Sequence, residues 1–310
     1  MMLNGSFGIV ESGEGKGSIF IEEIAEKIEM FVGFKPFFGT LNLENIDKRG
    51  LDKIEIEEIG NDICKGFITH KCRINGIVSA TVIPMIEGYP EKKTEIISPV
   101  ELRKLFGLKN GENVLFSAEK DRWESNGAMI NLKELDLFES IIFDLDQTLV
   151  HLDVDWNRAY KDLESLVEEY IEGPIEDYRH KDIFEISKEN GLFDEVDRIL
   201  ENYEINGAKR SIPLGLVEKI EMLESPISVC TINSSKAAKI ALEKAGILEK
   251  IECIIGRDKN KNKPDPEPLR LCIKKMGTSV GNSVFVGDSV SDAEAAYSAH
   301  MSYIHPDQIY

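Results

Sequence analysis

Acidic side chains stand at two places where a buried strand is expected to end. The apolar run SIIF leads into Asp144 and Asp146, and residues two apart on a strand point to the same side. The apolar run SVFV leads, after one glycine, into Asp288 and then Asp292. In open parallel sheets the carboxyl ends of the strands line the ligand crevice. The sequence therefore predicts a site in this crevice where several carboxylates, one pair of them of nucleophile type, lie together.

A hydroxyl group and a cation are expected at the same edge. Thr231 lies at the end of another apolar run and is followed by Asn233-Ser234-Ser235 at a helix start, where free N–H groups attract an anion. Lys263 lies in KNKPDPEPL, just before a helix that is expected beyond Pro266. Each fragment alone also fits a turn or a solvated lysine. Their order and their strand context together favour one phosphate-binding crevice.

The second half of the chain alternates between strand and helix patterns, which predicts a Rossmann-like parallel sheet with covering helices. The expected strands are Ser140–Leu145, Ile227–Ile232, Ile251–Ile255 and Ser283–Val286. Helices are expected over Ser235–Ala245 and Pro266–Met276. An insert at about residues 153–211, with purely helical periodicity, follows the first strand and is interpreted as a mobile cap.

The first half has a different pattern, which predicts a small, mainly β barrel. Its short β-rich runs are SFGIVES, SIFIEEI, GTLNLENI, KGFITHKCRI, GIVSATVIP and ENVLFSA. Two helices are expected, near Ile24–Val32 and Pro99–Leu105. The polar stretch Glu119–Gly127 marks the boundary. We thus predict a barrel over residues 1–122, a linker over 123–137 and an α/β domain over 138–310.

Composition restricts the class of partner. The 310 residues carry a formal net charge of -19, from 56 acidic and 37 basic side chains, which argues against nucleic-acid and anionic-membrane partners. The five cysteines have no metal-ligand spacing, and no signal peptide or membrane span is visible. We expect a cytoplasmic enzyme that acts on small molecules.

The C-terminal part closely resembles the haloacid dehalogenase-like (HAD) phosphatases over about residues 138–310. The resemblance is carried by DLDQT from Asp144, by Thr231, by Lys263 and by GDSVSD from Gly287. It implies that Asp144 is the nucleophile and forms an aspartyl-phosphate. Asp146 is then the general acid and later the general base. Gln147 stands where the family commonly has glycine, and its side chain is expected to point away from the chemistry.

The same resemblance assigns the remaining groups. Thr231 and Lys263 are expected to hold the transferring phosphoryl group. Mg²⁺ is expected to bind Asp144, Asp288 and the backbone carbonyl of Asp146, with Asp292 orienting these ligands.

Glycines and polar residues of the first half suggest a second phosphate site. Gly13, Gly15 and Gly17 follow a strand candidate and would let backbone N–H groups approach a phosphate. Thr40 and Asn42 fall on one side of a strand, and nucleotide phosphates could complete a Mg²⁺ shell around them. By themselves these features also fit a hairpin turn and an ordinary sheet face.

Residues 6–117 resemble the archaeal CTP-dependent riboflavin kinases. The resemblance rests on G-x-V-x-S-G-x-G at Gly8–Gly15, F-x-P-F-x-G-T-L-N-L at Phe34–Leu43 and E-I-I-S-P-x-x-L-R at Glu95–Arg103. It implies a small β-barrel that transfers a phosphoryl group from CTP to riboflavin and makes FMN.

The family pattern assigns residues to nucleotide, metal and flavin. Thr40 and Asn42 are expected to bind Mg²⁺, and Glu95 and Glu87 to contact the flavin. The nucleotide is expected to contact Gly13, Glu14, Gly15, Lys16, Gly17, Glu101, Leu102, Arg103 and Lys104. The sequence departs from the pattern at Lys16, where an acidic residue is usual, and after Pro84, where a basic-Thr pair is usual.

Together the two resemblances predict a bifunctional flavin-biosynthesis enzyme. A phosphatase that hydrolysed FMN would oppose the kinase, so a ribityl-phosphate precursor of riboflavin is the preferred substrate. One alternative is a HAD phosphatase that acts on FMN or a sugar phosphate and is regulated by a non-catalytic barrel that senses flavin or nucleotide. Another is a general phosphatase whose barrel serves assembly only.

Overall fold

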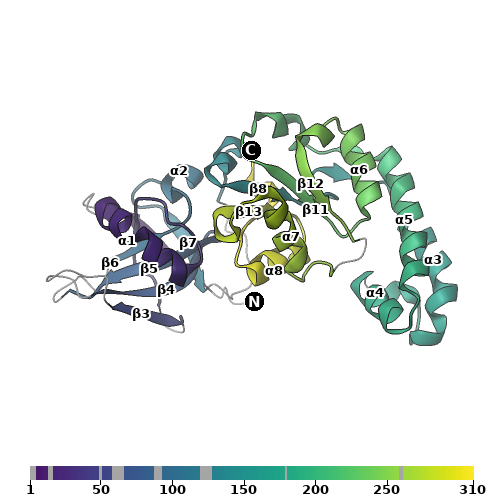
Figure 1. Ribbon diagram of the computed structural model, residues 1–310, viewed down its shortest axis with the longest axis horizontal. Coiled ribbons are helices and arrows are strands. Elements are labelled where there is room, and N and C mark those ends of the chain that lie inside the picture. The colour runs from purple at the N-terminus through teal and green to yellow at the C-terminus, as the bar shows by residue number, and fades with distance from the viewer. Residues whose placement is uncertain are drawn as a thin grey trace.

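The computed structural model describes residues 5–12, 17–48, 51–57, 66–86, 93–118, 128–178, 180–257 and 261–310. It confirms the predicted fold class, an N-terminal antiparallel barrel and a C-terminal parallel α/β sheet with a helical insert (Figure 1). The predicted boundary stretch Glu119–Gly127 lies outside the described residues. Within the described ranges, no helix is both long enough and apolar enough to cross a membrane.

The barrel is closed by pairing between β4 (Gly66–Ile74) and β7 (Asn113–Ala118). In the described residues the order is β4-β5-β6-β2-β1-β7, β7 pairs back onto β4, and β3 extends the free edge of β4. Closure leaves few unpaired strand edges. The strands are β1 (Gly5–Glu11), β2 (Leu41–Glu44), β3 (Lys53–Glu57), β4 (Gly66–Ile74), β5 (Ile77–Pro84), β6 (Lys93–Ile97) and β7 (Asn113–Ala118).

One of the strands predicted for the barrel is part of a helix. The run Ser18–Ile24, expected as a strand, is the first half of α1 (Gly17–Val32). No helix breaker separates it from the helix expected beyond Ile24, and the helical spacing of the buried residues decides the outcome. These buried residues are Ile21, Ala25, Ile28 and Val32. The second helix, α2 (Leu102–Phe106), ends at Gly107, whose φ of +62° is easy for glycine.

The C-terminal sheet is parallel, in the order β12-β11-β8-β13-β14. Four strands were predicted and the short edge strand β14 was not. β8, β11 and β13 are buried along their whole length, as expected for a sheet covered on both faces. The strands are β8 (Ser140–Phe143), β11 (Ile227–Cys230), β12 (Ile251–Ile255), β13 (Ser283–Val286) and β14 (Ser302–Ile304). The intervening helices are α6 (Ser235–Lys244), α7 (Glu267–Met276) and α8 (Val290–Ala299).

The insert is helical, as predicted, and consists of α3 (Trp156–Val167), α4 (His180–Glu189) and α5 (Phe193–Arg210). It has its own apolar core, which includes Leu163 and Val167. A two-stranded ribbon of β9 (Val150–His151) and β10 (Ile212–Pro213) joins its two ends. In Figure 1 these helices lie on the side of the α/β sheet away from the barrel.

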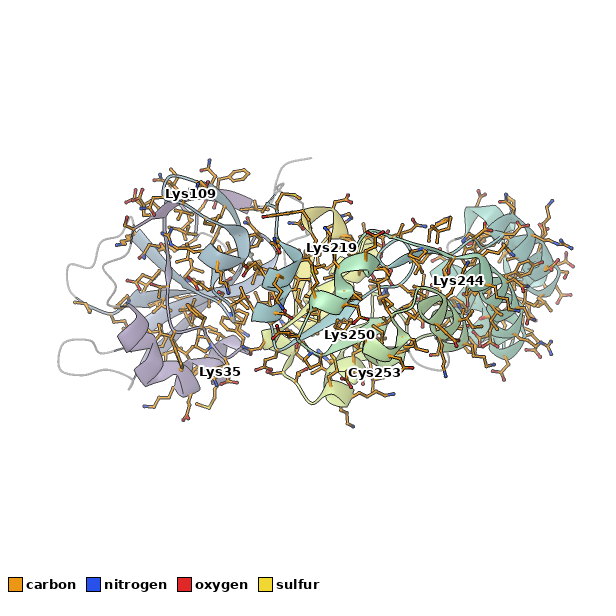
Figure 2. The ribbon with its side chains drawn as sticks, turned by 90° about the horizontal axis from the view of Figure 1, so that it is seen from above. Lys35, Lys109, Lys219, Lys244, Lys250 and Cys253 are labelled. Atoms are coloured by element: carbon orange, nitrogen blue, oxygen red, sulfur yellow. The ribbon has the colours of Figure 1, made fainter. Side chains whose placement is uncertain are left out.

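The barrel and the α/β domain are in direct contact. One cluster of buried apolar side chains extends from Val10 in the barrel to Val229 in the parallel sheet. Asn282 Oδ1 accepts a hydrogen bond from Lys35 N, and Asn282 Nδ2 donates one to Lys35 O, both at 2.9 Å. Gly281 lies so close to Gly33 O that a Cβ would not fit. Figure 2 shows Lys35 where the barrel meets the α/β domain.

Candidate active sites

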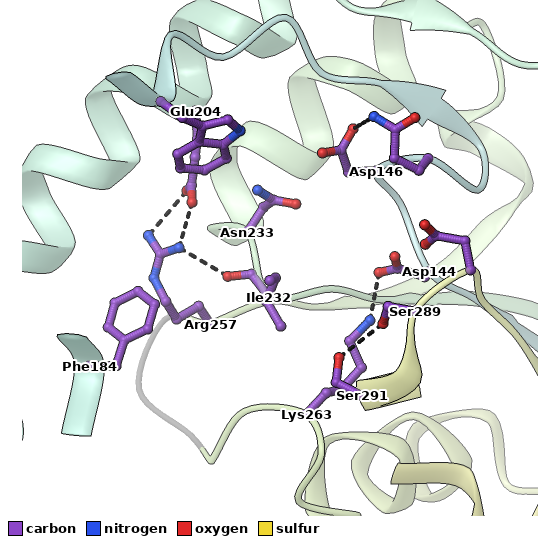
Figure 3. A pocket seen from close by; sticks show the side chains of 13 residues that line it. Asp144, Asp146, Phe184, Glu204, Ile232, Asn233, Arg257, Lys263, Ser289 and Ser291 are labelled. Atoms are coloured by element: carbon purple, nitrogen blue, oxygen red, sulfur yellow. Dashed lines mark hydrogen bonds and ion pairs between the residues drawn. The ribbon is translucent and has the colours of Figure 1, made fainter. Parts of the chain in front are cut away.

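Three carboxylates and one lysine meet at the carboxyl edge of the parallel sheet. Asp144 directly follows β8, and its backbone N donates to Val286 O of β13 at 2.8 Å. Lys263 Nζ lies 2.6 Å from Asp144 Oδ1 and 2.5 Å from Asp292 Oδ1. Oxygen atoms of Asp144, Asp288 and Asp292 all lie within 4.8 Å of one another. The predicted convergence of these four residues is therefore present, and Figure 3 shows the pair Asp144 and Lys263.

The start of α8 orients the third carboxylate. Ser289 caps this helix, and its backbone N and its Oγ both donate to Asp292 Oδ2, at 3.0 and 2.7 Å. The other oxygen of Asp292 faces Lys263. Both oxygens thus have protein partners, which fits the orienting role expected for Asp292.

Burial and charge set the protonation of the central pair. Burial raises the pKa of Asp144 to about 7, and the adjacent ammonium group of Lys263 opposes this rise. Burial alone would lower the pKa of Lys263, but the charges of Asp144 and Asp292 outweigh it and raise that pKa. Lys263 therefore stays cationic, and it favours the ionised carboxylate that a nucleophile requires.

Asp146 has different surroundings. Its Oδ1 accepts a hydrogen bond from Leu152 N at 2.7 Å, and burial raises its pKa. Gln147 adopts a φ of +61°, a left-handed conformation that explains why glycine suits this position. The expectation that the Gln147 side chain points away is wrong. It lines the cavity, with Nε2 2.7 Å from His151 Nδ1 and 3.5 Å from Asp146 Oδ1, because the turn after β8 directs it there.

The loop after β11 brings Thr231 to the same sheet edge. Thr231 Oγ1 accepts a hydrogen bond from Asn233 N at 3.1 Å and lies 2.9 Å from Asn233 Oδ1, to which it donates. Thr231 is buried, and Asn233 is the residue of this loop that lines the cavity with Ile232. Ser234 caps α6, as expected for a helix start.

Sequence reasoning missed a buried ion pair that joins the insert to the sheet edge. Arg257 Nη1 lies 2.5 Å from Glu204 Oε1 and donates to Ile232 O at 2.9 Å, and Arg257 Nε lies 2.7 Å from Asp197 Oδ1. Arg257 and Glu204 are each 1% exposed. Glu204 also accepts from Ser234 N at 2.9 Å. Two signals could have found the pair: Arg257 closely follows β12, and Glu204 continues the buried stripe of α5.

The cavity between sheet edge and insert has a volume of about 230 Å³. Besides the carboxylates, Lys263 and Arg257, two aromatic side chains of the insert line it, Trp156 and Phe184. The guanidinium carbon of Arg257 lies 4.8 Å from the centre of the Phe184 ring. The lining of the cavity thus combines charged side chains with two aromatic rings (Figure 3).

The barrel has a separate cavity of about 150 Å³. Thr40, Glu101, Leu102 and Arg103, all predicted site residues, line it together with Phe37. Arg103 Nη2 donates to Glu11 O at 2.6 Å. The start of α2 and the end of the loop before β2 therefore meet at this cavity.

Other predicted barrel residues lie near this cavity or cannot be placed. Asn42, which is buried, pairs in register with Glu95 across β2 and β6, so the predicted metal and flavin residues are neighbours. Lys104 does not line the cavity and instead lies 3.6 Å from Glu134. Gly17 begins α1. The predicted residues Gly13, Glu14, Gly15, Lys16 and Glu87 lie outside the described residues.

The fold and the first site define a class. A parallel α/β sheet presents a buried aspartate–lysine pair and two further aspartates at its carboxyl edge, where open sheets of this kind bind ligands. Residues 141–305 match the family model described as haloacid dehalogenase-like hydrolase, which is more than half of the 310-residue chain. The chain belongs to this family.

Residues 10–117 match a second family model, CTP-dep_RFKase, which is described as a domain of unknown function, DUF120. The chain is 37% identical to the riboflavin kinase of Archaeoglobus fulgidus, over 33% of this chain and 48% of that protein. It is 35% identical to the riboflavin kinase of Thermococcus kodakarensis, over 34% of this chain and 55% of that protein. The chain thus spans about half the length of these relatives, and it joins a riboflavin kinase-family domain to a HAD-family domain.

Solved structures resemble the α/β domain. A putative phosphoglycolate phosphatase from Lactobacillus plantarum is 20% identical, with a TM-score of 0.41, and the match covers 55% of this chain and 87% of that one. CbbY from Rhodobacter sphaeroides, solved with phosphate, is 16% identical, with a TM-score of 0.43, over 54% and 85% of the two chains.

Proposed function

We propose that the protein serves flavin biosynthesis through two activities. The α/β domain hydrolyses a phosphate monoester with Mg²⁺, and the barrel phosphorylates riboflavin with CTP to make FMN. The observation that carries the proposal is the fusion, in one chain, of a riboflavin kinase-family domain with a site in which Lys263 lies 2.6 Å from the buried Asp144.

The residues of the α/β domain support a two-step hydrolysis. The Asp144 carboxylate attacks phosphorus, the bond from phosphorus to the ester oxygen breaks, and Asp146 gives its proton to the leaving alcohol. Asp146 then takes a proton from water, which attacks the aspartyl-phosphate, releases inorganic phosphate and restores Asp144. The raised pKa of Asp146 suits it to begin as the acid.

The donor set fits Mg²⁺. Asp144, Asp288 and Asp292 offer hard oxygen atoms within 4.8 Å of one another, close to a single ammonium group. Asp144 and Asp288 would hold the ion, with Asp292 orienting them. Bound Mg²⁺ would supply electrostatic neutralisation of the phosphoryl oxygens. Lys263 adds a second positive charge on the same side.

Two observations support a ribityl-phosphate precursor of riboflavin over FMN as the substrate. Hydrolysis of FMN in the same molecule would undo the kinase reaction and consume CTP. The cavity, at about 230 Å³, is small for a ligand site, and the aromatic side chain of Trp156 in its lining could stack on a heterocycle. A phosphorylated ribitylamino-pyrimidine has one ring where the flavin has three, so a small cavity favours it over FMN.

The barrel cavity supports the kinase assignment. Thr40 lies beside Arg103 at this cavity, and Asn42 pairs with Glu95 in the adjoining strands. Hydroxyl and amide oxygens of Thr40 and Asn42 would complete a Mg²⁺ shell together with nucleotide phosphates. Arg103 would place a cation near those phosphates, and Glu95 would accept the proton of the ribityl hydroxyl.

Replacement of the nucleophile tests the hydrolase. Asp144→Asn should reduce hydrolysis of p-nitrophenyl phosphate to background, because an amide cannot form the acyl phosphate. Substantial remaining turnover would refute the assigned nucleophile.

A product assay tests the kinase. The protein is incubated with riboflavin, Mg²⁺ and either CTP or ATP, and FMN is measured by chromatography. We expect FMN with CTP, and its loss in Asn42→Ala. Riboflavin binding without FMN formation would instead support the alternative in which the barrel is a non-catalytic flavin sensor.

A further inference from the structure

The barrel covers the edge strand of the hydrolase sheet. The hairpin between β4 and β5 turns at Asn75 and Gly76, whose φ values of +50° and +89° are typical of a two-residue Asn-Gly turn. Gly76 O accepts a hydrogen bond from Tyr303 N of β14 at 3.3 Å, and Val78 N of β5 donates to Ser302 Oγ at 3.2 Å. β14 has β13 on its other side, so the barrel occupies the side of β14 that the sheet leaves free.

A buried arginine of the barrel fixes this contact. Arg73 on β4 is 0% exposed, and its Nη1 donates to Gly76 O at 3.0 Å and to Met301 O at 2.9 Å. The guanidinium carbon lies 4.0 Å from the centre of the Tyr297 ring of α8. A buried charge is costly unless partners and hydrogen bonds compensate for the lost water. Arg73 therefore joins the hairpin tip, the start of β14 and α8 in one arrangement.

The same strand holds the loop that carries Asp288. Tyr303 is fully buried, and its Oη donates to Gly287 O at 2.6 Å. Gly287 N donates to Ile304 O at 3.3 Å, and His305 Nε2 lies 3.2 Å from Asp288 O. A Cβ at Gly287 would meet Asp292, so this loop has little room to move. β14 and the adjacent His305 thus hydrogen-bond the backbone of the two residues, Gly287 and Asp288, that follow β13.

We propose that Arg73 is a positioning residue of the hydrolase, through which the barrel fixes β14, Tyr303 and the Asp288 loop for Mg²⁺ binding. The inference rests on the proposed function in one respect, the assignment of Asp288 as a Mg²⁺ ligand. It makes the kinase-family domain a structural part of the phosphatase site. Loss of the Arg73 contacts lowers Mg²⁺ affinity while the nucleophile, Lys263 and Asp146 stay in place.

The test is Mg²⁺ binding by the full-length protein, measured by isothermal titration calorimetry. An Asn42→Ala background removes the predicted barrel site, so that the hydrolase site is observed alone. Mutation of residues that hydrogen-bond the metal ligands typically changes metal affinity by about 10- to 100-fold. Arg73 lies further from the ligands than such residues. We therefore expect Arg73→Met to weaken Mg²⁺ binding by only about 3- to 10-fold. Tyr303→Phe, which keeps the ring and removes only the bond to Gly287 O, should weaken it at least as much. Lys53→Met, which removes an exposed cation of the same barrel, should leave it unchanged.

Measurements of activity at saturating Mg²⁺ distinguish weaker Mg²⁺ binding from poor folding. Turnover of p-nitrophenyl phosphate by Arg73→Met should return to within about twofold of the parent value at saturating Mg²⁺, which general unfolding would not allow. If Arg73→Met binds less than one equivalent because it folds poorly, Tyr303→Phe decides the question. Parent-like Mg²⁺ affinity in Tyr303→Phe, or in a folded Arg73→Met, overturns the inference and leaves the proposed function intact. Mg²⁺ binding that persists in Asp288→Ala overturns the metal assignment of the proposed function, and the inference with it.

Discussion

Two aspartates only two residues apart have different neighbours, which is the basis for the different roles proposed for them. Asp144 lies 2.6 Å from Lys263. Burial raises the pKa of Asp144, and the charge of Lys263 opposes that rise. Asp146 has no lysine among the main causes of its raised pKa, which burial dominates and a backbone hydrogen bond from Leu152 opposes. Titratable groups with different environments commonly divide the acid and nucleophile roles in this way.

This division predicts the behaviour of Asp146→Asn. Loss of a general acid or base typically costs about 10²- to 10⁴-fold, so turnover of an alkyl phosphate should fall by that factor. With p-nitrophenyl phosphate the leaving group needs no proton, but the aspartyl-phosphate still needs a base. We therefore expect a burst of about one equivalent of nitrophenol followed by slow turnover, measured by stopped-flow absorbance.

An exposed carboxylate nearby provides the control for this experiment. Asp153→Asn removes a charge that pairs with Arg210 at 2.6 Å outside the cavity. Its kinetics should stay close to those of the parent protein. Equal turnover of alkyl phosphate by Asp146→Asn and the parent would contradict the acid–base role.

At the scale of elements, helix α5 fastens the insert to the sheet edge through Glu204 and Arg257. Glu204→Ala would leave the buried guanidinium with Asp197, Ile232 O and the Phe184 ring but without its most buried carboxylate partner. Breaking a buried ion pair by removal of one partner costs about 3–5 kcal/mol, so urea unfolding should show a loss of that order. The value of kcat/KM for phosphate esters should fall as well, because Glu204 also holds Ser234 N beside Thr231.

The matched control lies one turn away on the same helix. Glu201 pairs with Lys236 of α6 at 3.0 Å, but that lysine side chain is 72% exposed. Glu201→Ala should therefore change the free energy of unfolding by only about 0–1 kcal/mol. Similar losses in Glu201→Ala and Glu204→Ala would show that the buried pair does not fasten the insert.

Gly207, near the end of α5, allows a prediction of whether Gly→Ala stabilises or destabilises the protein. In an exposed helix interior, Gly→Ala stabilises by about 1 kcal/mol. At Gly207 a Cβ would lie 2.5 Å from Val154 Cγ2 and 3.0 Å from Val154 N, because the chain that enters the insert crosses the helix there. Gly207→Ala should destabilise instead, by about 1–3 kcal/mol in urea unfolding. Gly215→Ala, with no atom near the new Cβ, should change little.

The elements also show what a sequence can specify. The fold class and the convergence of Asp144, Lys263, Asp288 and Asp292 could be predicted, because apolar strands with polar residues directly after them imply one sheet edge. Strand β14 could not be predicted, because a strand of three residues, Ser302–Ile304, is too short to show a periodic pattern. The ion pair between Arg257 and Glu204 depends on how the insert packs on the sheet. Packing between elements distant in sequence leaves no local pattern.

At the scale of the whole molecule, the proposed function gives the chain two sites that act on phosphates. The barrel and the α/β domain share an apolar cluster and are joined by hydrogen bonds at Lys35 and at Arg73. The two domains are therefore joined by a packed interface as well as by the chain itself. Such an arrangement is useful to the cell only if the two reactions do not cancel.

That requirement gives the last prediction. With riboflavin, CTP and Mg²⁺, the parent protein should form CDP and FMN in a ratio near one throughout the reaction, because each transfer yields one of each. If the hydrolase accepted FMN, CDP would continue to rise while FMN reached a plateau, and inorganic phosphate would appear. Chromatography of the nucleotides and flavins measures both products. Asp144→Asn is the control: a ratio near one in this variant, with a rising ratio in the parent protein, would establish FMN as a hydrolase substrate and exclude the proposed division of labour.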